Sequence, residues 1–161
     1  MKKCSGISIA VAGLSLICGA GAAAQTASAK QQVAVEVKPV TRLVVSGAPL
    51  PLVVTSGGEN ASATDRTSSY SLVTNLRNMR IAASIDRPMP AGTSLAIMLE
   101  SSRGTSMGEV DITASTGSAE VVAGIGPGSD NDQRITYRFS AQPGVSEIAA
   151  QVRTVTLTLT E

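Results

Sequence analysis

Apolar and polar residues alternate with a period of two along four stretches of the chain. These stretches are residues 32–38, 94–100, 134–140 and 154–160. Successive side chains of a β-strand point to opposite faces, so each stretch presents one apolar and one polar face. This pattern is typical of half-buried strands in antiparallel sheets. The chain is therefore predicted to be all-β and antiparallel.

Weaker strand candidates lie between these stretches, and turn clusters rich in Gly, Pro, Ser and Asp separate them. The candidates are residues 42–45, 52–55, 69–73, 79–85, 109–113 and 120–123, and the turns lie at residues 46–49, 56–60, 86–92, 115–118, 124–132 and 142–144. About 8–10 short strands at this spacing predict a single β-sandwich over residues 31–161. A short helical turn is expected near residues 146–150, and the polar residues 56–68 predict a long mobile loop.

The first thirty residues have the three zones of a secretory signal peptide. Lys2 and Lys3 precede an apolar run over residues 7–18, and small residues follow. Cleavage is expected after Ala24 or after Ala29, and Ala24 is favoured because it lies closer to the apolar run. The prediction is a signal peptide over residues 1–24 and a flexible lead over residues 25–30.

The apolar run is too short to span a bilayer, which needs about 20 residues, so no transmembrane anchor is expected. Lipidation of Cys18 is the alternative processing, and it is disfavoured because Ile17 precedes the cysteine where a small residue is expected. The predicted location is the periplasm, the cell surface or the extracellular medium.

Composition narrows the functions that such an exported domain can have. The sequence contains no His and no Trp, so it cannot form a Ser-His-Asp triad or a His-ligated zinc site. Without Lys2 and Lys3, 11 basic and 12 acidic residues remain, which gives no reason to expect a nucleic-acid partner. The two cysteines, Cys4 and Cys18, lie in the predicted signal peptide, so the mature chain has no disulfide. A protein that is not an enzyme and has no cofactor is predicted.

Two groups of acidic residues are candidates for other chemistry. Asp130 and Asp132 lie close to Gly126 and Gly128 and offer oxygen ligands for calcium, although the same residue types also form hairpin turns. Paired carboxylates for glycoside hydrolysis would come from Glu100, Glu109, Asp111 and Glu120. Because sugar sites usually need aromatic platforms and the chain has three aromatic residues, a solvated charged row is the favoured interpretation.

The first and last predicted strands are candidate assembly strands. Val33, Val35 and Val37 form the apolar face of the first, and Val155, Leu157 and Leu159 form that of the second. A strand at a sheet edge has unpaired N–H and C=O groups that can pair with another molecule. The alternative is that both strands complete the sandwich of their own domain, as most terminal strands do.

The alternating strand at residues 31–38, the stretch 135–141 and the closing stretch 155–160 resemble those of bacterial pilin-like and spore-coat-U-like surface proteins. This resemblance implies an immunoglobulin-like sandwich, a role in a surface fibre or coat, and assembly by strand exchange. The mature chain differs from such pilins because it lacks a disulfide.

The predicted function is an exported, non-catalytic structural or adhesive protein of the bacterial envelope or surface, whose partners are further copies of itself or other surface subunits. The alternative is a periplasmic or secreted ligand-binding module for calcium or a sugar.

Overall fold

The computed structural model describes residues 28–55, 61–114 and 117–161. The chain divides into two units, Met1–Glu36 and Val37–Glu161. In the first unit, residues 28–36 have exposed side chains and no regular secondary structure. The predicted signal peptide, with Cys4 and Cys18, lies outside the described residues. In the described part of the chain, no helix is long and apolar enough to cross a membrane.

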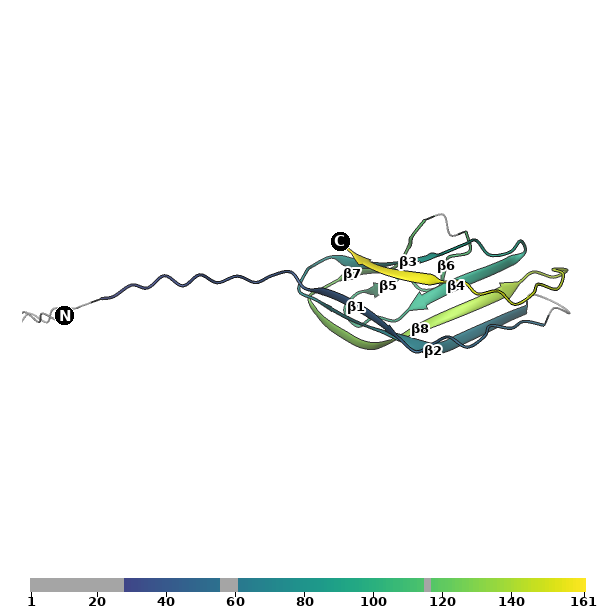
Figure 1. Ribbon diagram of the computed structural model, residues 1–161, viewed down its shortest axis with the longest axis horizontal. Coiled ribbons are helices and arrows are strands. Elements are labelled where there is room, and N and C mark those ends of the chain that lie inside the picture. Colours follow the sequence, from purple (N-terminus) through teal and green to yellow (C-terminus); the bar gives the residue numbers. More distant parts are fainter. Residues whose placement is uncertain (1–27, 56–60, 115–116) are drawn as a thin grey trace, which may run out of the picture. The chain divides into compact units, whose positions relative to one another are not determined.

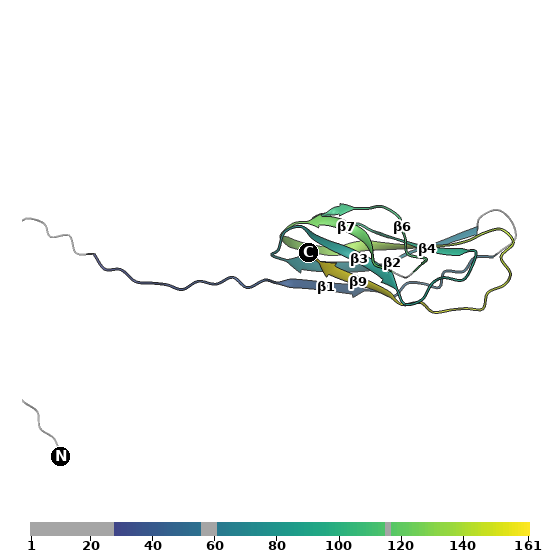
Figure 2. The ribbon, with the colours of Figure 1, turned by 90° about the horizontal axis from the view of Figure 1, so that it is seen from above.

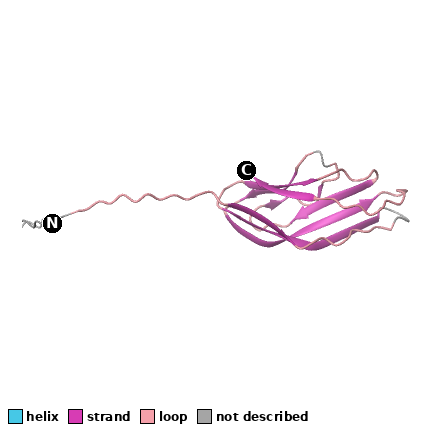
Figure 3. Ribbon diagram, viewed as in Figure 1, coloured by secondary structure: helices cyan, strands magenta, loops and turns pink. Residues whose placement is uncertain are grey.

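The second unit is built from strands and loops (Figure 3). Its strands are β1 (Thr41–Ser46), β2 (Ala61–Thr74), β3 (Met79–Ile85), β4 (Thr93–Leu99), β5 (Thr105–Ser106), β6 (Val110–Asp111), β7 (Ala119–Ile125), β8 (Gly128–Ala141) and β9 (Val155–Thr160). They form two sheets, in the orders β1-β2-β8-β4-β6 and β5-β7-β3-β9 (Figure 1). Every pair of neighbours is antiparallel. The predicted all-β, antiparallel fold is confirmed.

The inward-facing side chains of both sheets form one hydrophobic cluster. Its buried members are mainly aliphatic, and Tyr70 and Tyr137 are its buried aromatic residues. The alternation along β4 places Leu95, Ile97 and Leu99 in this cluster and leaves the intervening side chains partly exposed. Burial of these side chains is the main favourable contribution to folding.

The longest strands, β2 and β8, differ most from the sequence prediction. They pair with each other along most of their 14 residues each. Residues 61–68, predicted to be a mobile loop, belong to β2, and most of the predicted turn 124–132 belongs to β7 and β8. Both predictions were wrong because pairing between distant segments overrides local polar composition. Residues 56–60 of the predicted loop lie outside the described residues.

Three further elements predicted from the sequence do not form. Residues 146–150 are not helical, and residues 52–55 are not a strand. Residues 31–38 also form no strand, despite their regular alternation. Alternation marks a segment that is able to pair, whereas a strand also needs a neighbour to supply hydrogen bonds.

Candidate functional site

Strands β1 and β9 are edge strands of different sheets, and they lie side by side (Figure 2). Among the described residues, β1 pairs with β2 alone and β9 pairs with β3 alone. One edge of each strand therefore has N–H and C=O groups without a partner from a neighbouring strand. Such edges are sites at which a further strand can add.

The inner faces of these two strands form an apolar floor between them. Leu43 and Val45 lie opposite the core residues Leu72 and Tyr70 in the register of β1 with β2. Leu157 and Leu159 continue this floor from β9, where they lie opposite Ala83 and Ile81. The floor belongs to a hollow of about 340 Å³, which we call the β1–β9 groove. It is lined by Thr41, Arg42, Leu43, Val45, Leu157, Thr158 and Leu159.

The groove floor is covered less completely than the core. Val45 is 50% exposed, although the register of its strand places it opposite fully buried Tyr70. Leu43, Leu157 and Leu159 are only partly buried. The edge strands at the far end of each sheet are different, because β5 and β6 have only two residues each. Very short edge strands are one way in which proteins prevent unwanted pairing, so the side of the molecule with β1 and β9 offers the longer open edges.

The segment with alternating valines lies just before β1. Val33, Val35 and Val37 are 73%, 89% and 88% exposed. After them, residues 38–40 are bound to the end of β2 by Asn75. The Asn75 side chain accepts a hydrogen bond from the Val40 N–H and donates one to the Lys38 carbonyl, both at 2.8 Å. The Asn75 N–H donates to the Val40 carbonyl at 3.2 Å.

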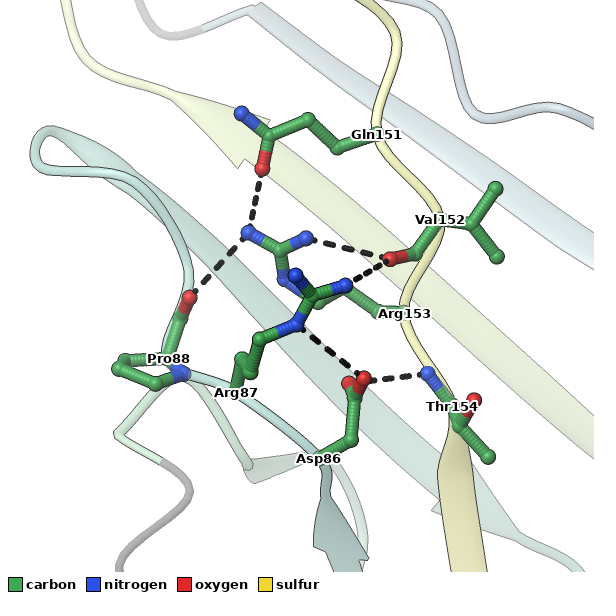
Figure 4. Close-up of polar contacts among 7 residues, drawn as sticks. All are labelled: Asp86, Arg87, Pro88, Gln151, Val152, Arg153 and Thr154. Atoms are coloured by element: carbon green, nitrogen blue, oxygen red, sulfur yellow. Dashed lines mark hydrogen bonds and ion pairs between the residues drawn. The ribbon is translucent and has the colours of Figure 1, made fainter.

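A polar cluster at the end of β3 anchors the residues that immediately precede β9 (Figure 4). The Thr154 N–H donates to the Asp86 carboxylate, and the Asp86 N–H donates to the Thr154 carbonyl, both at 3.0 Å. The hydrogen bond from Thr154 is the main cause that lowers the pKa of Asp86, and Arg87, 3.4 Å from the carboxylate, adds to it. The guanidinium of Arg153 donates to the oxygens of Val152, Pro88 and Gln151. These contacts fix the position at which β9 begins.

Asp130, a candidate calcium ligand, is buried within β8 and is bound by protein donors. It accepts hydrogen bonds from the Ser101 hydroxyl at 2.8 Å, from the hydroxyl and N–H of Ser102, and from the Arg103 N–H at 3.3 Å. Burial raises the pKa of Asp130, but the hydrogen bonds from Ser102 and Ser101 outweigh it and hold this pKa below its ordinary value of 3.8. The carboxylate thus accepts hydrogen bonds that hold the loop after β4 in place.

Asp132 also belongs to β8, but its side chain is exposed and its φ is 50°. The expected turn at Asp130 and Asp132 is therefore replaced by a strand with an irregular register opposite β2. Across the described ranges, no group of three or more acidic or cysteine side chains is arranged to hold a metal ion.

Three of the four other acidic candidates have polar partners of their own. Glu100 and Glu109 form half-exposed ion pairs with Arg134 and Arg138, at 3.6 and 3.4 Å. The Asp111 carboxylate accepts a hydrogen bond from the N–H of Thr113, at 2.7 Å. A second hollow of about 180 Å³ lies on the outer face of β2, β4 and β8, and Glu109 is the one acidic residue of its lining. Neither of the two hollows is lined by a pair of carboxylates, which glycoside hydrolysis requires.

Of the predicted assembly residues, Val155, Leu157 and Leu159 lie on the inner face of β9, opposite Ile85, Ala83 and Ile81. The pairing of β1 with β2 places Leu43 and Val45 on the same floor. No local pattern in the sequence indicates this pairing. Comparison with known proteins identifies no relative: no protein-family model, no curated protein and no solved structure matches the chain.

Proposed function

We propose that the protein is an exported, non-catalytic structural subunit of the bacterial cell envelope or surface, and that it associates with further copies through its sheet-edge strands. The observation that carries this proposal is the β1–β9 groove, an apolar floor between two open strand edges. Export is supported by the charged and apolar zones of residues 1–24. The absence of His excludes a Ser-His-Asp triad and a His-ligated zinc site.

In this proposal, residues 31–38 of one copy add as a strand to the groove of the next. The main chain of the added strand would bond to the open edge of β1, and its three valines would cover the floor. Burying one exposed valine side chain contributes about 1.5–3 kcal/mol. Three such contributions are partly offset by the loss of translational and rotational freedom and by the ordering of the segment. Among the described residues of one copy, nothing covers the exposed valines or fully covers the floor, so these are two apolar surfaces available to a partner.

The test is light scattering after size exclusion on the chain that begins at Gln25. We expect concentration-dependent oligomers from this chain. Val35→Asp is expected to abolish them, because it would place a charge on the apolar floor. Val53→Asp is the matched control, since Val53 is 75% exposed and lies outside the segment and the groove lining.

Three results would contradict the proposal. A chain that stays monomeric at every concentration would refute association. Equal loss of oligomers in Val35→Asp and Val53→Asp would indicate unspecific apolar contact. Unfolding of a version that lacks residues 25–38 would show that the segment completes the core of its own domain instead.

A further inference from the structure

We propose that the β1–β9 groove accepts residues 31–38 of a second copy in one direction and one register, antiparallel to β1, with Glu36 of the added strand opposite Arg42. This inference rests on the proposed function and specifies its contact. The argument depends on the faces of the two strands, on the direction of insertion and on charge.

Alternation along the added strand and along β1 determines which of their side chains lie on the same face. If Val33, Val35 and Val37 cover the floor, then Ala34 and Glu36 lie on the opposite face of the added strand. On β1, Leu43 and Val45 face the floor, so Arg42 and Val44 lie on the outer face, opposite Val73 and Ser71 of β2. Glu36 and Arg42 are therefore on the same outer face.

The direction then decides whether these two charges meet. In the antiparallel arrangement, Val35 of the added strand lies opposite Leu43. Val33 then lies opposite Val45, and Glu36 lies opposite Arg42. In the parallel arrangement with the same central contact, Ala34 takes the place beside Arg42, and Glu36 lies beside Val44. Arg42 lines the groove, and the ion pairs found within the described residues join other arginines. Glu36 is the one acidic residue between residues 28 and 40, so the segment offers a single charge to complement Arg42.

Charge also fixes the register, which the valines alone leave open. A shift of the added strand by two residues keeps valine side chains on the floor, because the side-chain period is two. The same shift moves Glu36 away from Arg42. Opposite charges directly across a pair of strands stabilise the pair, whereas like charges destabilise it. The ion pair between Glu36 and Arg42 thus distinguishes the proposed register from registers that are shifted by two residues.

The experiment is a charge swap measured as a dissociation constant by titration calorimetry. The acceptor is the chain from Gln25 with Val35→Asp, which keeps the groove and cannot donate its own segment. The ligand is a synthetic peptide of residues 30–39. We expect Glu36→Lys in the peptide, or Arg42→Glu in the acceptor, to weaken binding about tenfold, because each replaces an attraction with a repulsion. Combining both changes should restore binding to within about threefold of the original pair.

Arg66→Glu in the acceptor is the matched control, because Arg66 is exposed on β2 and lies outside the groove lining. It should bind the original peptide unchanged, and all acceptor variants should keep the thermal midpoint of the parent. Binding that is insensitive to both single changes would overturn the register while leaving the proposed function intact. Loss of binding without rescue in the swapped pair would also overturn it. Failure of the peptide to bind any acceptor would overturn the proposed function as well.

Discussion

Two aspartates within the long strands fasten neighbouring loops without facing solvent. Asp65 of β2 accepts hydrogen bonds from Thr67 and from the Leu50 N–H, and Asp130 of β8 accepts them from the loop after β4. Both side chains are buried. A buried carboxylate is costly unless donors compensate for the lost water, and charge-assisted hydrogen bonds supply that compensation. These aspartates are therefore structural residues of the fold.

We predict that Asp130→Ala lowers the free energy of unfolding by about 3 kcal/mol, because the donors of Ser101, Ser102 and Arg103 lose their acceptor. Because the pKa of Asp130 is lower in the folded state than its ordinary 3.8, the wild-type carboxylate contributes stability above about pH 4. That contribution is lost as the pH falls through the folded-state pKa.

Urea unfolding between pH 2 and pH 7 measures both effects. Asp130→Asn is the control, because it keeps the size of the side chain and removes its ionisation, so its stability should depend less on pH in the acidic range. Equal acid sensitivity of Asp130→Asn and the wild type would contradict the assignment.

The role of Asp130 was not predictable from its neighbours in the sequence. Asp, Asn and Gly are typical of turns and of calcium loops, and both interpretations of residues 130–132 depended on that local composition. Its donors lie 27–29 residues earlier in the chain, and Leu72 pairs with it from β2. Such contacts between distant residues are set by the whole fold, so local spacing does not reveal them.

At the scale of elements, alternation between apolar and polar residues located strands correctly where a neighbouring strand pairs with them. The alternating stretch 154–160 and the weaker candidate 79–85 correspond to β9 and β3, which pair with each other. The same criterion marked residues 31–38, which stay unpaired in one copy. It also missed the polar beginnings of β2 and β8, because strands with polar faces gain their stability from cross-strand pairing. Half of the groove floor was predictable from alternation along β9, whereas the half from β1 required the register with β2.

We predict that Asp86→Ala loosens the beginning of β9. The Thr154 N–H would lose its acceptor, so its hydrogen exchange should become faster, as should that of the next residues of β9. Exchange measured by mass spectrometry on the intact chain tests this prediction. Asp111→Ala is the matched control, because it removes a similar contact between a carboxylate and a backbone N–H, that of Thr113, which does not involve β9. Unchanged exchange at the start of β9 in Asp86→Ala would show that strand pairing with β3 alone positions it.

At the scale of the whole molecule, the second unit has one side with six-residue edge strands and another with two-residue edge strands. In the proposed assembly, each copy offers one segment and one groove, and these surfaces are unlike. Contacts between unlike surfaces produce a ring if the rotation closes, or an open filament if it does not.

This arrangement predicts the behaviour of a mixture of two defective chains. Val35→Asp removes the donor segment, and Val45→Asp places a charge on the groove floor at a half-exposed position. We expect neither chain to associate alone. An equimolar mixture should form one-to-one dimers and nothing larger, because only one intact segment and one intact groove can meet in each pair. Light scattering gives the mass directly, and larger oligomers in the mixture, or dimers of either chain alone, would contradict the prediction.

The binding of Lys38 and Val40 by Asn75 has a mechanical consequence for such an assembly. The added strand would end at Lys38, and β1 of the same copy begins at Thr41, so only Pro39 and Val40 separate the two. An extended residue spans about 3.5 Å, and the proline ring restricts rotation of the backbone. Successive domains would thus be joined by a short, stiff connection. In the proposed antiparallel register, Lys38 of the added strand and Thr41 of the accepting β1 lie at the same end of the strand pair, and tension along the assembly pulls on both. The hydrogen bonds of the added strand would therefore open one after another from that end.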